Sequence, residues 1–133
     1  MKGFLLDTDI VIFFLRNKKG IREKLAKLNV HDIYISEITV ADLEYGNHCS
    51  GRYEENKLMI DEFLSNVNIV PFSKSIAKYA SERYRLQKEG MSISDFDLII
   101  GCSAVAMGLT MLTNNISHFS RIKDIKIESW IKD

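Results

Sequence analysis

Short apolar runs alternate along the chain with longer stretches in which apolar residues recur at the spacing of one helix face. The short runs predict β-strands at residues 3–6, 32–35, 67–70, 109–112 and 125–127. The longer stretches predict helices at residues 10–15, 21–28, 37–48, 53–65, 74–89 and 96–107. Strands that alternate with helices favour an α/β fold, with a central, mainly parallel, twisted sheet flanked by helices on both sides.

Two of the predicted helices differ in how their apolar residues are distributed. Residues 96–107 are apolar nearly all round, which predicts a central, buried helix. We expect the helix at residues 74–89 to lie on the surface, with one apolar face buried and its charges in solvent. That apolar face would consist of Ile76, Tyr79, Ala80, Tyr84 and Leu86.

The length of 133 residues fits one domain, which we assign to residues 1–133. The formal net charge is zero, which argues against a protein that coats nucleic acid by charge alone but leaves room for a nuclease with a local basic patch. Cys49 and Cys102 lack paired spacing, so we expect free thiols. Because we find neither a signal peptide nor a membrane span, we expect a cytoplasmic protein with no membrane partner.

Three aspartates occupy similar places in this pattern. Asp7 follows the first predicted strand, where open α/β sheets bind ligands, and Asp42 and Asp97 lie in the first halves of two predicted helices. Each has an ordinary structural explanation, since Asp7 can cap the helix that follows it and residues 94–97 match a capping box. Three acids that converge from separate elements would instead form an oxygen-lined site for a hard divalent cation.

Helical geometry favours the metal-binding interpretation. Asp42 shares an inward face with apolar residues, whereas Glu44, two positions on, points well away from it. A carboxylate on an inward face needs a partner, because isolated burial of a charge is costly. Asp97 shares its face with Gly101 and Ala104, and we expect these small residues to leave space for an ion and a phosphate.

No serine or cysteine lies in a recognisable nucleophile motif with a histidine and an acid. We interpret the three histidines, His31, His48 and His118, as surface residues. Covalent hydrolysis and histidine acid–base cleavage are therefore disfavoured.

Four blocks of the sequence, in this order, resemble VapC-type toxins of the PIN-domain family. They are residues 5–10 (LLDTDI), residues 35–46 (ISEITVADLEYG), residues 94–100 (SDFDLII) and residues 112–115 (LTNN), the last followed by Phe119 and Trp130. The resemblance covers nearly the whole chain. It implies a PIN-like fold, a magnesium- or manganese-dependent endoribonuclease that cuts RNA, a cognate VapB-type antitoxin that inhibits it, and a homodimer. Relatives act on several RNA classes, among which transfer RNA is modestly preferred here.

The resemblance also assigns the site residues. It implies that Asp7 and Asp97 are the first and third metal-binding acids, and that Asp42 stands at a second position where the family usually has glutamate. Glu44 is the fallback if the register is shifted by two. Asn115 matches a fourth catalytic position that is often aspartate, so it lends an amide oxygen and no charge. Asp9 and Asp95 match neighbouring positions and are expected to be caps or outer partners.

Such a site would hydrolyse RNA with a metal-activated water, because a bound Mg²⁺ lowers the pKa of its water and offsets charge on the phosphate. The products would be a 5′-phosphate and a 3′-hydroxyl. Without metal, we expect at least one carboxylate to have a raised pKa, because clustered anions repel one another. Six basic residues are candidate guides for the RNA backbone, or else ordinary surface charges: Lys18, Lys19, Arg22, Arg83, Arg85 and Lys88.

Two alternatives remain open at this stage. The first predicted strand and Asp7–Asp9 also fit a haloacid dehalogenase-like phosphatase with Asp7 as nucleophile, although that chemistry needs a lysine, and none lies between Glu89 and Arg121. The second alternative is a PIN-fold interaction module whose catalysis is weakened by Asp42 and Asn115.

Overall fold

The structure is a computed structural model that describes residues 3–131, and its centre is a five-stranded parallel sheet in the order β3–β2–β1–β4–β5. The strands are β1 (Phe4–Leu6), β2 (Ile33–Ser36), β3 (Asn68–Val70), β4 (Thr110–Leu112) and β5 (Lys126–Glu128). Every neighbouring pair is parallel, and Leu6 of β1 is in register with Leu112 of β4. All five predicted strands are confirmed, each to within about one residue at either end, and the all-parallel sheet confirms the predicted α/β class.

The helices confirm the predicted alternation with strands. They are α1 (Thr8–Leu15), α2 (Ile21–Leu25), α3 (Glu37–His48), α4 (Tyr53–Ser65), α5 (Ile76–Lys88), α6 (Asp95–Met107) and α7 (Ile116–Phe119). Single 3₁₀ turns lie at Val30–Asp32 and Phe72–Lys74. The segment 21–28 is helical only as far as Leu25, and α7 was not predicted, because four residues are too few to show helical periodicity.

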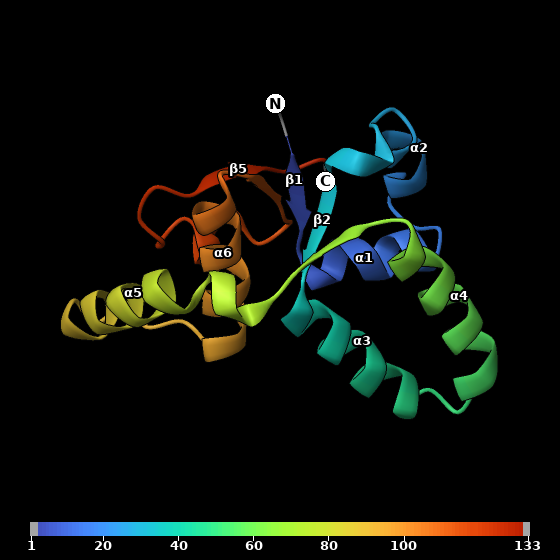
Figure 1. The fold of residues 1–133 in the computed structure, drawn as a ribbon, viewed down its shortest axis with the longest axis horizontal. Coiled ribbons are helices and arrows are strands. Elements are labelled where there is room, and N and C mark those ends of the chain that lie inside the picture. Colours follow the sequence, from blue (N-terminus) through green and yellow to red (C-terminus); the bar gives the residue numbers. More distant parts are fainter. Residues whose placement is uncertain (1–2, 132–133) are drawn as a thin grey trace.

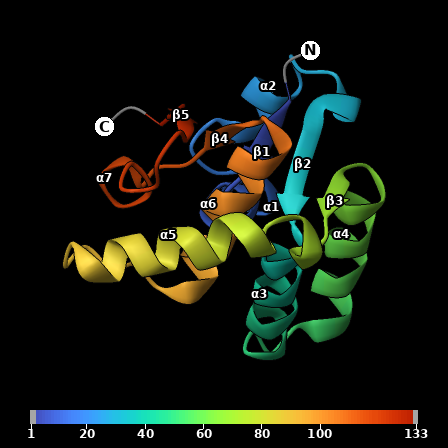
Figure 2. The ribbon, with the colours of Figure 1, turned by 60° about the vertical axis from the view of Figure 1, so that its left-hand side comes forward.

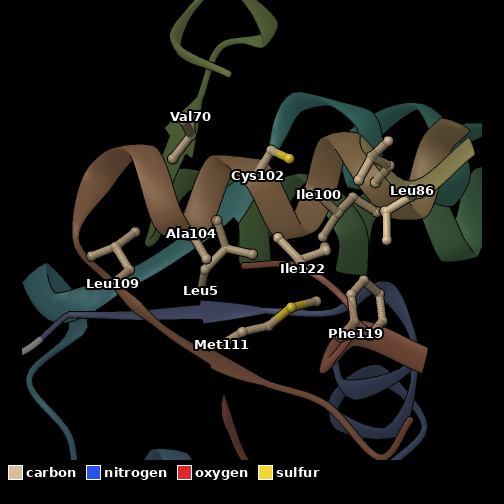
Figure 3. Close-up of a cluster of buried hydrophobic side chains, with 11 residues drawn as sticks. Leu5, Val70, Leu86, Ile100, Cys102, Ala104, Leu109, Met111, Phe119 and Ile122 are labelled. Carbon is tan, nitrogen blue, oxygen red and sulfur yellow. The ribbon is translucent and has the colours of Figure 1, made fainter. Parts of the chain in front are cut away.

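Helices cover both faces of the sheet (Figures 1 and 2). On one face, α5 and α6 enclose a core that includes Leu5, Leu86, Ile100 and Phe119 (Figure 3). On the other face, α1 to α4 enclose a second core around Leu6, Ile10, Leu43 and Phe63. The parallel strands are buried on both sides, as their continuous apolar runs predict. This arrangement holds the carboxyl ends of β1, β2 and β4 at one edge of the molecule.

The prediction that residues 96–107 form a central, buried helix is confirmed, since every residue of α6 from Leu98 to Ala104 is buried. The prediction for α5 was wrong in its details. Ile76 and Tyr84 are 47% and 63% exposed, whereas Glu82 is only 3% exposed and lies with Leu86 on the buried face. An acidic residue that binds a cation of its own chain can lie in the core, and amphipathic periodicity does not reveal this.

Two further expectations can be compared with the structure. In the described part of the chain, both Cys49 and Cys102 are free thiols, as predicted. Between residues 3 and 131, no helix has the length and apolar character that crossing a membrane requires.

Candidate functional site

Asp7 lies at the carboxyl end of β1 and caps the first turn of α1. Because β1 and β4 pair in register at Leu6 and Leu112, the next residues, Asp7 and Thr113, come together. The Asp7 carboxylate accepts hydrogen bonds of 2.8 Å from the Thr8 amide and 2.8 Å from the Thr113 hydroxyl. Asp7 is only 5% exposed. The capping function and the candidate metal site therefore fall on the same side chain.

Asp42 reaches the same edge from α3. The Thr8 hydroxyl donates to Asp42 Oδ2 at 3.1 Å and lies 3.0 Å from the Thr39 hydroxyl. Thr8 therefore contacts both acids, Asp7 through its backbone amide and Asp42 through its hydroxyl. Glu44 lies elsewhere, where its carboxylate accepts from the Tyr53 hydroxyl and is 3.3 Å from His48 Nε2. The geometry associates Asp42, and not Glu44, with Asp7.

The expectation that Asp42 shares an inward face with apolar residues was wrong. Ala41 is exposed and Tyr45 is 73% exposed, whereas the buried residues of α3 are Thr39, Leu43 and Asn47.

Asp97 enters the site from the first turn of α6, the helix that precedes β4. Ser94 caps this helix by accepting a 3.4 Å hydrogen bond from the Asp97 amide. The Asp97 carboxylate instead lies 3.1 Å from His118 Nε2. Asp95 is directed toward the Tyr79 hydroxyl and Arg83, away from Asp97's partner.

The expectation that all three histidines lie on the surface was wrong for His118. Its side chain is 24% exposed and contacts Asp97, whereas His31 and His48 are exposed. Predicting the helix α7 from the sequence would have indicated this contact, because that helix places His118 three residues after Asn115. That helix was too short to predict.

Asn115 caps α7 close to Asp7. The backbone N–H of Asn115 donates a 2.9 Å hydrogen bond to the Thr113 hydroxyl, and that hydroxyl in turn donates to Asp7. The Asn115 side chain is exposed, with no hydrogen bond to it in the described residues. Thr113, which the sequence analysis did not single out, thus connects the first and fourth candidate positions.

The expectation that Gly101 and Ala104 leave space for an ion was wrong. A Cβ at position 101 would lie 2.3 Å from Ile122 and 3.3 Å from Phe119, so glycine permits close packing there. Ala104 is fully buried in the core between β1 and α6 (Figure 3). Both small residues therefore serve close packing and leave no space for an ion.

Two of the acids, Asp7 and Asp42, have raised pKa values. Burial raises the pKa of Asp7 to about 6, and the charges of Asp9 and Asp97 act in the same direction, against the two hydrogen bonds. The pKa of Asp42 is raised for the same first reason, burial, and again by Asp97 and Asp9. The raised pKa of Asp7 agrees with the prediction of at least one raised carboxylate, but its first cause is burial and not repulsion among the anions.

In the described part of the chain, no lysine or arginine pairs with Asp7, Asp42 or Asp97. Within residues 3–131, neither Asp7 nor Asp42 has an ion pair, and no three acidic, histidine or cysteine side chains close on one point as a metal site. Several candidate RNA guides are engaged elsewhere. Arg22 donates to backbone oxygens of α1, Arg83 lies 3.7 Å from Asp95, and Arg85 pairs with Glu82 at 2.8 Å.

The chemistry of the donors nevertheless suits Mg²⁺ or Mn²⁺. All the candidate ligands are oxygens, and Mg²⁺ commonly binds through one or two carboxylates while water completes its coordination. An open arrangement of one buried and two half-buried acids therefore fits such an ion better than it fits zinc, which prefers a closed site of nitrogen and sulfur ligands.

Comparison with known proteins adds independent evidence. The PIN domain family model matches residues 4–125. Ribonuclease VapC2 of Rickettsia felis is 37% identical over 134 residues, covering 97% of this chain and 98% of the relative. The tRNA(fMet)-specific endonuclease VapC of Salmonella typhimurium is 34% identical over 132 residues, covering 98% and 99%.

Solved structures show the same similarity. The DNA-bound VapBC complex of Salmonella typhimurium contains a chain that superimposes with a TM-score of 0.89 at 33% identity, covering 98% of this chain and 99% of that one. A chain of VapBC2 from Rickettsia felis, bound to a promoter DNA fragment, gives a TM-score of 0.87 at 33% identity, covering 96% and 98%.

Proposed function

Because this chain belongs to the PIN-domain family, as a VapC-type ribonuclease toxin of a VapBC toxin–antitoxin system, we propose that it hydrolyses RNA with Mg²⁺ or Mn²⁺ bound at Asp7, Asp42 and Asp97. The observation that carries this proposal is the state of Asp7. A nearly buried carboxylate with a raised pKa, beside further acids and without an ion pair among residues 3–131, is suited to bind an external cation.

Each residue of the site has a distinct task. Asp7 is held by Thr8 and Thr113, which fix its carboxylate by two hydrogen bonds. Asp42 is positioned by Thr8, and Asp97 lies beside His118. A bound divalent ion would supply a water of lowered pKa and offset the charge of the phosphate.

Asn115 would act on the RNA, or on water, through its exposed amide. It adds no charge, so it orients a group without strengthening the hold on a second ion. The reaction adds water across the phosphodiester, so that the phosphorus keeps the new hydroxyl as a 5′-phosphate and the 3′-oxygen takes up a proton.

The relatives suggest the substrate and the partner. Proteins of Shigella flexneri and Salmonella typhimurium carry the name tRNA(fMet)-specific endonuclease, which makes transfer RNA the first substrate to test. The related solved structures are complexes with an antitoxin, and we propose a VapB-type antitoxin as the inhibitor of this chain as well. A homodimer is part of the same proposal.

Membership of the PIN-domain family decides against the phosphatase alternative. The interaction module is tested by activity. Protein purified free of its antitoxin should cut initiator transfer RNA in the presence of Mg²⁺, with 5′-phosphate ends, and EDTA should stop the reaction. The Asp7→Asn protein, prepared identically, controls for contaminating nucleases.

Matched acids test the assignment of residues. Asp97→Asn should abolish cleavage, whereas Asp95→Asn, in the same helix turn but directed toward Tyr79, should cut at nearly the parent rate. Likewise Asp42→Ala should lose far more activity than Glu44→Ala. Parent-rate cleavage by Asp7→Asn or Asp97→Asn would remove that residue from the proposed metal site.

A further inference from the structure

A cavity of about 160 Å³ lies beside the acids, between α1, α3 and α4. Figure 1 shows α3 and α4 side by side, with α1 across them near the sheet. Asp42 belongs both to the carboxylate edge and to the wall of this cavity. A strand whose phosphodiester lies at the acids therefore has the cavity next to it.

Gly46 is a sign that this cavity is kept open. It lies within α3 and lines the cavity, and a Cβ built on it would meet no atom within 4 Å. Its φ is not positive, so neither packing nor backbone conformation requires glycine. Glycine inside a helix is less stable than alanine. The one evident effect of the missing side chain is access to the cavity.

Polar groups in the wall have free bonding capacity. Arg16, which ends α1, lines the cavity and is exposed, and within residues 3–131 its guanidinium has neither an ion pair nor a hydrogen bond. Asn56 of α4 donates a 3.0 Å hydrogen bond to the Ser50 hydroxyl, which fixes its amide while its carbonyl oxygen has no donor in the described residues. Apolar residues, among them Ile12 and Leu43, form the remaining wall.

We propose that this cavity binds one nucleobase of the RNA, adjacent to the cleaved phosphodiester. Arg16 would bind a backbone phosphate, and the Asn56 amide would bind the edge of the base. A cavity of roughly 150 Å³ accepts one benzene-sized ring, and single-stranded RNA is commonly read by bases that leave the stack and enter such pockets. The inference rests on the proposed ribonuclease function.

Charge and position favour RNA as the occupant over a polypeptide. Arg16, which has no ion pair among residues 3–131, attracts an anionic backbone, and Asp42 makes the cavity continuous with the carboxylate edge. A larger hollow of about 420 Å³, between α1, α2 and α4, includes none of the three acids, so nothing connects it to the cleaved strand.

The test measures binding without cleavage. In an Asp7→Asn background, which is not expected to cut, the affinities of short RNA homopolymers and of an abasic ribose-phosphate chain are measured by fluorescence anisotropy. At least one homopolymer should bind about tenfold more tightly than the abasic chain, as one well-placed base contact provides. Adding Gly46→Leu or Asn56→Ala should reduce that homopolymer to the affinity of the abasic chain and leave the abasic chain unchanged.

Ala41→Leu, on the exposed side of α3, is the matched control and should keep the tenfold preference. Three results would overturn the base pocket: Gly46→Leu and Asn56→Ala that both retain the preference, an equal loss of affinity for both chains, or a loss of affinity for the antitoxin alone. A parent protein that cuts no RNA while these affinities behave as expected would overturn the ribonuclease proposal and leave the base pocket standing.

Discussion

Asp7 and Glu82 are both nearly buried carboxylates, at 5% and 3% exposure, yet their pKa values move in opposite directions. Glu82 accepts hydrogen bonds of 2.9 and 2.8 Å from the Arg85 guanidinium and one of 2.6 Å from the Lys123 amide. These contacts, the Arg85 bond foremost, lower the pKa of Glu82 to about 2. Burial instead raises the pKa of Asp7 to about 6.

The two pKa values differ because the chain supplies a positive counter-charge to Glu82 and none to Asp7 among the described residues. Arg85 neutralises Glu82 from within α5, and the Lys123 contact connects this helix to the segment after α7. Among the described residues, the donors to Asp7 are one hydroxyl and one amide, and its charged neighbours, Asp9 and Asp97, are negative. A buried carboxylate that pairs with a cation of its own chain has a structural function. A buried carboxylate without such a cation is expected to bind an outside cation, because the burial of an unpaired charge is costly.

The largest expected effect is on catalysis. Asp7→Asn should lower kcat/KM for transfer RNA by about a thousandfold, because it removes a preorganised charge from the site. Glu82→Gln, at equal burial, should retain the parent kcat/KM in the folded protein. Single-turnover cleavage at saturating Mg²⁺ measures both. Equal losses in the two variants would mean that the distinction between the two acids is wrong.

The next effect is on the free energy of unfolding, which we expect to fall when the Glu82 pair is broken but not when the Asp7 charge is removed. Arg85→Met leaves Glu82 buried without its cation and should lower the free energy of unfolding by about 3 kcal/mol. Asp7→Asn should not lower it in metal-free protein at pH 7.5, since it removes an unfavourable charge. Urea unfolding in EDTA measures both changes, with Tyr84→Ala as an exposed control on α5. An Asp7→Asn protein as unstable as Arg85→Met would contradict the comparison.

The sequence predicted the sheet and the proximity of Asp7 and Asp42 well, for a physical reason. A short apolar run that ends at Asp7 identifies both a buried strand and the position of its carboxyl end, and the helix period in α3 separates Asp42 from Glu44. These are local properties of the chain. They suffice to bring Asp7 and Asp42 to one edge, because parallel strands place their carboxyl ends together.

Contacts through space could not be predicted in the same way. The burial of Glu82 depends on Lys123, far along the chain, and the requirement for Gly101 depends on the position of Ile122. Neither leaves a periodic signal. His118 was missed because its helix is a single turn, and its contact with Asp97 follows only once α6 and α7 are packed together.

A third prediction separates the two acids by pH. The folded state holds the Asp7 proton more tightly than the unfolded state, so metal-free protein should lose stability as the pH rises from 3.8 to about 6, by about 3 kcal/mol. Glu82 acts in the opposite sense. Its pKa is depressed, so its contribution is present above pH 4.5 and is lost as the pH falls toward 2.

Unfolding free energies of the parent, Asp7→Asn and Glu82→Gln proteins across this range give the two contributions as differences. The advantage of Asp7→Asn over the parent should grow between pH 4 and 6 and then level off, whereas the advantage of the parent over Glu82→Gln should shrink below pH 4.5. Saturating Mg²⁺ should abolish the first trend and leave the second, because the proposed metal site includes Asp7 and not Glu82. If Mg²⁺ changed the pH dependence of the difference between the parent and Glu82→Gln proteins, the ion would bind at Glu82 and the comparison would be wrong.

The smallest expected effect concerns His118, which sits between these two kinds of site: it is a group of the chain that contacts a candidate metal ligand. We expect His118→Ala to lower cleavage about tenfold, the low end of the range for partners that orient a metal ligand, because His118 and Asp97 are both partly exposed. The loss should shrink when Mg²⁺ is raised, since a misplaced Asp97 weakens ion binding before it affects the bound reaction. His48→Ala, which changes a histidine beside Glu44, should have no such effect. A loss in His118→Ala that extra Mg²⁺ leaves unchanged would assign the histidine to the RNA and not to the positioning of Asp97.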